Sequence, residues 1–154
     1  MEEKPSEKEI VKILHAILYA FEAAVGTPGS KVLIHVSRKI PEIFGKFGFD
    51  LRKGENPEES VKRLLKILEE TGMLKDTEFK RIDEQTFEFR LGECSLAESK
   101  VHDILKEEKV FCPYSIAVAA VLREATGRDV VLSESELTEK GSVTKMRLYK
   151  YVVL

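Results

Sequence analysis

FCPYSIAVAAVLREATGRDVVLSESELTEKGSVTKMRL, residues 111–148, is the stretch that decides the fold. A Cys-Pro step opens it, a nearly all-apolar segment follows, and Gly127 closes that segment. Pro113 suits the first position of a helix, because the N–H that proline lacks would have no helical partner there. Glycine readily takes the left-handed conformation that ends many helices. The pattern therefore predicts a helix between Pro113 and Gly127.

This expected helix has no polar face before Arg123. A helix that is apolar all round is buried on more than one side. It is too short to cross a membrane, which takes about 20 apolar residues. Ala117, Ala119 and Ala120 would let another backbone or a ligand come close. We expect the helix to be the central element, covered by a sheet and by other helices.

The surrounding sequence predicts both strands and further helices. Strands are expected at 79–82, 86–91, 130–135 and 143–153, where the apolar period is two or β-branched residues gather. Helical periods, caps and stops predict helices at 6–26, at 30–47, from Asn56 to Gly72, and at 95–105. This order predicts an α+β domain, with an antiparallel four-stranded sheet packed against a helical layer. A helical part (1–75) would precede the α+β part (76–154) of a single domain.

Composition limits the class of function. The net charge of −2 over 154 residues, 34% of them charged, gives no basic field to attract nucleic acid. No apolar run resembles a signal peptide or a membrane span, so we expect a cytoplasmic protein. Two cysteines, Cys94 and Cys112, are too few for a disulfide framework or a four-cysteine metal site.

Side chains able to do chemistry are few. His15, His35 and His102 lack a partner at metal-binding spacing, and structural or surface roles are expected for them. Cys112 begins the central helix, where a thiol can have a lowered pKa, but an inert buried thiol is the favoured interpretation. Glu134 is of interest because its strand should pack near that helix.

Three features carry a family resemblance: a strand ending in Gly92-Glu93-Cys94, the Cys112-Pro113-Tyr114 helix start, and the alanine-rich helix ending at Gly127. With them, residues 87–148 resemble the 4-vinyl-reductase-type (hydrocarbon-binding) domain. Its fold is related to the subunits of the TRAPP transport-particle tethering complex and to NO-signalling ligand-binding domains. The resemblance implies a homodimer with a closed, mostly apolar pocket between helices and sheet. Five residues are expected to line or flank that pocket: Cys112, Tyr114, Val118, Leu122 and Phe89.

The resemblance also raises the question of zinc. Related domains in phenol-sensing regulators hold zinc with a cysteine, a glutamate and two further cysteines. Cys112 and Glu134 match the first two ligands, whereas Leu137 and Thr144 or Lys145 stand at the other positions. These side chains cannot replace thiolates, so we expect no zinc or other cofactor.

Our interpretation is a stand-alone cytoplasmic module that buries a small hydrophobic molecule, such as a hydrocarbon, an aromatic compound or an acyl chain, as a sensor or carrier. One alternative is a structural interaction or tethering dimer with a filled core and no ligand. Another is an enzyme, a vinyl-tetrapyrrole reductase, as the family's name suggests. The sequence has no nicotinamide or flavin motif, which disfavours the enzyme.

Overall fold

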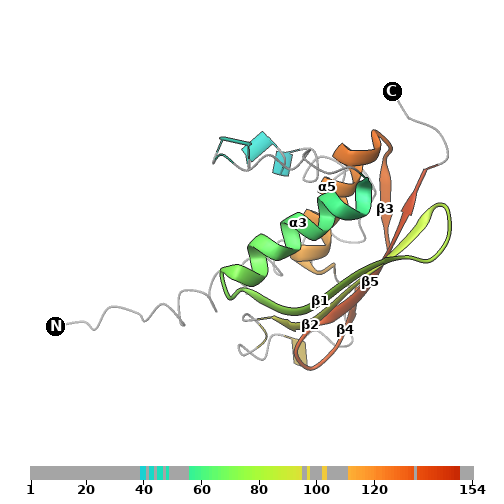
Figure 1. Cartoon of the computed structure of the whole chain (residues 1–154). Helices are drawn as coiled ribbons and strands as arrows, with labels where there is room; N and C mark the ends of the chain where they lie inside the picture. The colour runs from blue at the N-terminus through green and yellow to red at the C-terminus, as the bar shows by residue number, and fades with distance from the viewer. Residues whose placement is uncertain are drawn as a thin grey trace.

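The computed structural model describes residues 39–40, 42–43, 45–46, 48, 56–94, 97, 102–103, 111–133 and 135–149. Its complete elements are α3 (Pro57–Glu70), β1 (Leu74–Arg81), β2 (Thr86–Cys94), α5 (Pro113–Thr126), β3 (Val130–Leu132), β4 (Glu136–Leu137) and β5 (Ser142–Leu148). Figure 1 shows both helices on one side of the sheet. The described positions between 39 and 46 are helical. The helix expected at 6–26 lies outside the described residues. The helices expected at 30–47 and 95–105 are described only in part.

Helix α3 begins and ends where the sequence predicts. The Asn56 side chain accepts a hydrogen bond from the Glu59 N–H at 2.8 Å, and Pro57 takes the first helical position. Gly72 follows the last turn with φ +76°, a conformation that glycine adopts without strain. The apolar side of α3 presents Leu64, Leu65 and Leu68 to the core.

Helix α5 confirms the central-helix prediction. Cys112 is its N-cap residue in extended conformation, and Gly127 ends it at φ +66° with its N–H donated to the Arg123 carbonyl. At the same end the Arg123 guanidinium pairs with the largely buried Asp129 carboxylate at 2.9 Å. This ion pair ties the end of α5 to the chain that enters β3.

The sheet is antiparallel throughout, in the order β1-β2-β5-β3, with β4 also paired to β5. The antiparallel sheet is thus confirmed, but it has five strands, because the strand expected at 130–135 stops at Leu132. The Ser133 N–H still donates to the Lys145 carbonyl at 2.9 Å, but the Lys145 N–H bonds to the Ser133 hydroxyl and not to its carbonyl. The register on β5 shifts by one residue before β4 resumes pairing, as at a β-bulge.

Three other expected strand limits change. β1 begins at Leu74, five residues earlier than expected, because charged side chains on its exposed side hide the alternation. β2 extends to Cys94, and β5 ends at Leu148, whereas the expected strand ran to 153. Residues 150–153 lie outside the described part of the chain.

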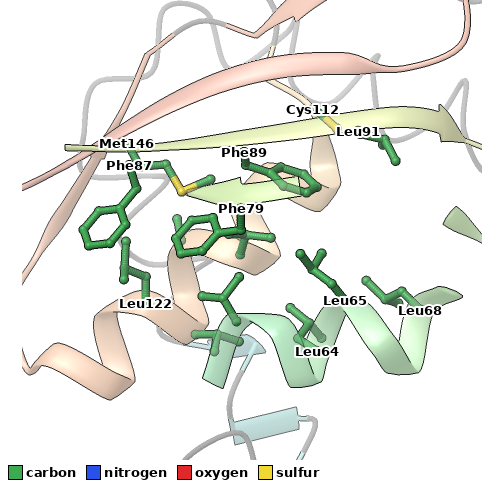
Figure 2. Close-up of a cluster of buried hydrophobic side chains, with 14 of the residues drawn as sticks. Leu64, Leu65, Leu68, Phe79, Phe87, Phe89, Leu91, Cys112, Leu122 and Met146 are labelled. Atoms are coloured by element: carbon green, nitrogen blue, oxygen red, sulfur yellow. The ribbon is translucent and has the colours of Figure 1, made fainter. Parts of the chain in front are cut away.

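The core fills the space between the two helices and the inner face of the sheet. Figure 2 shows leucines of α3 facing Phe79 and Phe89, and Leu122 of α5 near Phe87 and Met146. The rings of Phe79 and Phe87 stack with centroids 5.3 Å apart. Burial of these side chains, at roughly 25 cal/mol per Å² of apolar surface, is the main force that holds α5 in place.

Candidate functional site

The five residues expected at a pocket come together in this core. Phe89, Val118 and Leu122 have no exposed surface, and Cys112 is 3% exposed. Tyr114 is half-buried and packs against the same cluster. Four of them lie on α5 or at its start, because the helical period places Tyr114, Val118 and Leu122 on one side of the helix. The fold therefore places one side of α5 against Phe89 of β2.

A chain of hydroxyl groups lies under the amino-terminal turn of α5. The Ser115 hydroxyl donates to the Thr144 hydroxyl of β5 at 2.7 Å, and the Ser135 and Thr144 hydroxyls are also 2.7 Å apart. The Cys112 N–H donates to the Ser135 oxygen at 2.8 Å. All of these residues are buried, so the bonds satisfy polar groups that water cannot reach. The bulge after β3 is what turns Ser135 inward.

Two further hydroxyls in this region have only thiols beside them. The hydroxyl oxygens of Tyr114 and Ser142 are buried, and no group among the described residues meets them with good hydrogen-bond geometry; weak hydrogen bonds with the thiols of Cys94 and Cys112 are what remains. The thiols of Cys94 and Cys112 lie near the Tyr114 hydroxyl, and the Cys112 thiol is beside Ser142. A thiol is a weak hydrogen-bonding group, so it compensates a buried hydroxyl poorly. We call Cys94, Cys112, Tyr114 and Ser142 the polar cluster.

Burial controls protonation in the polar cluster. It raises the pKa of the Tyr114 phenol, and the neighbouring thiols of Cys94 and Cys112 act in the same direction. It also raises the pKa of the Cys112 thiol, although the neighbouring Ser142 hydroxyl acts against this. Both groups therefore stay protonated at neutral pH. Of the two interpretations of Cys112, the inert buried thiol agrees with this direction and the activated thiolate does not.

The surroundings of Cys112 do not suit zinc. Within the described ranges, no three His, Cys, Asp or Glu side chains come together as metal ligands. Thr144, at one expected ligand position, belongs to the hydroxyl chain, and Lys145 is exposed on the outer face. Glu134 lies outside the described residues. The serine and threonine hydroxyls near Cys112 are poor zinc ligands.

His102 is the one histidine that the structure describes, and its position is buried, which agrees with a structural role and not with a surface one. It is 4% exposed, and its Nδ1 is 3.1 Å from the Thr138 carbonyl oxygen. The reason is that the segment before β5 covers it, a contact that helical period alone does not reveal.

A groove on the other face of the sheet was missed by sequence reasoning. It is an open groove of about 640 Å³ that runs along β3 and β5. Its lining consists of residues 131–133 in and after β3, residues 145–149 in and after β5, and Gln85 and Thr86 at the start of β2. The available signal was the alternation along β5, where Lys145 and Arg147 point away from the core that holds Met146 and Leu148. The hydroxyls of Ser135, Ser142 and Thr144 were missed as well, because serine and threonine are common in loops and strands.

A search for membrane-spanning segments among the described helices finds none of sufficient length and apolar character.

Comparison with known proteins gives fold-level likeness. No family model matches the sequence, and no curated protein matches it. Trafficking protein particle complex subunit 3 from Naegleria fowleri, in a crystal structure covalently bound to palmitic acid, is similar over 96% of this chain and 98% of its own, with a TM-score of 0.51 and 13% identity. A structure from a study of heme distortion in the H-NOX family covers 99% of this chain and 76% of its own, with a TM-score of 0.47 and 12% identity. The first likeness confirms the predicted fold relation to TRAPP subunits.

Proposed function

We propose that this protein binds a small hydrophobic molecule between α5 and the sheet and serves as a sensor or carrier of that molecule. The observation that carries the proposal is the pair of buried hydroxyls of Tyr114 and Ser142, which have at most a thiol as partner. A buried hydroxyl without a partner destabilises a fold by about 1–3 kcal/mol. A ligand with a polar end would remove this penalty, and its apolar body would contact the side chains around Phe89.

The protonation of the polar cluster decides which polar end would bind. Because its pKa is raised, Tyr114 keeps its proton and acts as a hydrogen-bond donor. A carbonyl, ether or carboxyl oxygen would accept that bond. The likeness in fold adds support, since the Naegleria fowleri subunit is covalently bound to palmitic acid. An acyl or aromatic compound with one oxygen-bearing end is therefore the preferred ligand class.

Access to the polar cluster requires side chains to move. Phe89, Val118 and Leu122 pack without exposed surface, so an incoming ligand must separate them. Displacing packed side chains reduces the binding free energy that apolar contact supplies. We therefore expect binding to be accompanied by a change in the packing of α5 against β2.

Mass spectrometry of a denaturing extract, combined with thermal melting in the presence of palmitic acid and of phenol, tests the proposal. We expect a co-purified hydrophobic molecule, or a rise in Tm with one of the probes. Tyr114→Phe should reduce that rise, whereas Lys62→Gln, at an exposed position of α3 away from the core, should not. Protein that carries nothing and melts unchanged with both probes would contradict the proposal.

The dense packing of the same residues favours a second candidate, an interaction or tethering module with a filled core and no ligand. The TRAPP-type fold is compatible with it. A homodimer is expected for both candidates from the family resemblance, and light scattering that gives a 17.5 kDa particle would contradict the dimer. A dimer whose Tm responds to neither probe would favour the second candidate.

A further inference from the structure

The groove of about 640 Å³ lies on the outer face of the sheet, opposite to α5. Alternate residues of β5 define the two faces: Thr144 and Met146 are buried toward the helices, whereas Lys145 and Arg147 are exposed. This volume falls within the range of about 300–1,000 Å³ that is typical of small-molecule sites. The groove is therefore separate from the polar cluster and from the core site proposed above.

Arg147 lies at the centre of this groove. In the strand register it is directly opposite Val131 on one side and Thr86 on the other. Directly opposed side chains on one face of a sheet are within contact range. Tyr149 follows two residues along the chain, and its backbone is held by a bond from its N–H to the Asp129 carbonyl. The guanidinium thus has apolar and aromatic surface beside it, because Val131 is 37% exposed and Tyr149 41%.

The charge in the groove has one sign. Its lining, as far as the chain is described, contains Lys145 and Arg147 but no Asp or Glu, although the whole chain has a net charge of −2. The nearest acids in the strand register and the hairpin are engaged elsewhere. Glu88, opposite Lys145, lies 3.7 Å from both Lys80 and Arg90.

Asp83 is close enough to interact with Arg147. Its carboxylate accepts hydrogen bonds from the N–H groups of Gln85 and Thr86 at 2.8 and 2.9 Å. These bonds are the main cause that lowers the pKa of Asp83, with Arg147 a smaller one. The Arg147 guanidinium therefore retains donors for another anion.

We propose that this groove binds a small amphipathic carboxylate, with its carboxylate on Arg147 and its apolar body over Val131 and Tyr149. A guanidinium binds a carboxylate through two parallel hydrogen bonds, whereas the Lys145 ammonium adds a point charge. The apolar part of the ligand gains contact with surface that is otherwise exposed to water. This combination selects a medium-chain or aryl carboxylate over a neutral analogue or a highly polar anion.

NMR titration of the ¹⁵N-labelled full chain with decanoate, and with decan-1-ol as its uncharged counterpart, tests the proposal. We expect decanoate to shift amide signals at 131–133 and 145–149. Decan-1-ol should bind at least about tenfold more weakly, because it forms no charge-assisted hydrogen bonds. Arg147→Gln should weaken decanoate binding at least about tenfold, and Lys62→Gln, on the exposed side of α3, should leave it unchanged.

The same spectra show whether each variant folds. If Arg147→Gln does not fold, Val131→Glu replaces it, since a carboxylate beside Arg147 should abolish decanoate binding. The groove assignment is overturned if decan-1-ol binds as well as decanoate or if decanoate does not bind. Decanoate shifts confined to α5 and unaffected by Arg147→Gln would also overturn it, while supporting the core site. Groove signals that move with protein concentration alone would mean that a second copy covers this face, and would overturn it too.

Discussion

Both ends of α5 are buried, but the side chains around them differ in polarity. Toward the carboxyl end, Val118, Val121 and Leu122 are fully buried among apolar side chains. Toward the amino end, hydroxyls are buried, and two in the polar cluster have at most a thiol as partner among the described residues. One end of the helix thus supplies stability, and the other holds polar groups that reduce it. Burial alone does not identify a site, whereas an uncompensated polar group within a core points to one.

The largest effect is expected at the apolar end. Leu122→Ala removes a fully buried side chain that faces Phe87 and Met146, and should lower the free energy of unfolding by roughly 3 kcal/mol through lost burial and the cavity that remains. Urea denaturation measures this change. Ile82→Ala, at a 51% exposed position, is the matched control and should change stability by less than about 0.5 kcal/mol. Equal losses in the two variants would mean that α5 is not the centre of the core.

The hydroxyl chain gives the next largest effect. Thr144→Val keeps the shape of the side chain but leaves the Ser115 hydroxyl without its partner, which should destabilise the protein by about 2 kcal/mol. Adding Ser115→Ala should restore part of the loss, because the stranded hydroxyl is then gone. A double-mutant cycle in urea measures this coupling. Strictly additive losses would show that the hydrogen bond does not contribute.

Alkaline pH should lower the stability of the protein through the two titrating groups at the amino end of α5, Cys112 and Tyr114. Burial raises the pKa values of Cys112 and Tyr114 in the folded chain. The unfolded chain therefore releases the thiol proton above about pH 8.5 and the phenol proton above about pH 10, while the folded chain retains both. The unfolded state then binds fewer protons, and stability falls as pH rises, by about 1.4 kcal/mol per pH unit for each group. Urea midpoints between pH 7 and 11 measure the fall. Tyr114→Phe should flatten its upper part, and Tyr149→Phe should not; identical profiles would refute the assignment.

The smallest expected effect is a gain in stability. In the ligand-free protein, Tyr114→Phe removes a buried hydroxyl that has at most a thiol as partner, and it should raise the stability at neutral pH by up to about 1 kcal/mol. Thermal melting of extracted protein measures it. A loss of more than about 1 kcal/mol would mean that the hydroxyl is hydrogen-bonded in solution, and it would remove the basis of the proposed core site.

Much of the fold follows from local pattern. The helix limits lie where predicted: α3 begins at Asn56 and Pro57, and α5 begins at Cys112 and Pro113 and ends at Gly127. The antiparallel arrangement follows from the short period-two segments. The beginning of β1 and the break between β3 and β4 did not follow, because they depend on cross-strand register and on one serine hydroxyl that replaces a backbone acceptor.

Part of the candidate site could also be predicted from the sequence, and part of it could not. The burial of the residues on α5 could be predicted, because a helix without a polar face must be covered on more than one side. Their role in binding stays a prediction. The environment of the Ser142 hydroxyl could not be predicted, since it is set by residues of β2 and α5 that are distant in the chain. The outer groove was also unpredicted, because its charge balance depends on which acids on neighbouring strands are already paired.

By itself the sequence determined which helix is buried, where that helix begins and ends, and that the strands around it are antiparallel, because hydrophobic period and capping act over a few residues. Only the tertiary structure decided that polar groups from β2, β5 and α5 meet beneath one end of that helix. It also decided that Arg147 faces a groove with exposed apolar surface and with no acid among the lining residues that are described. The physical reason is that hydrogen bonding and ion pairing are satisfied between side chains that come together in space, and no local pattern records which partners will be within reach.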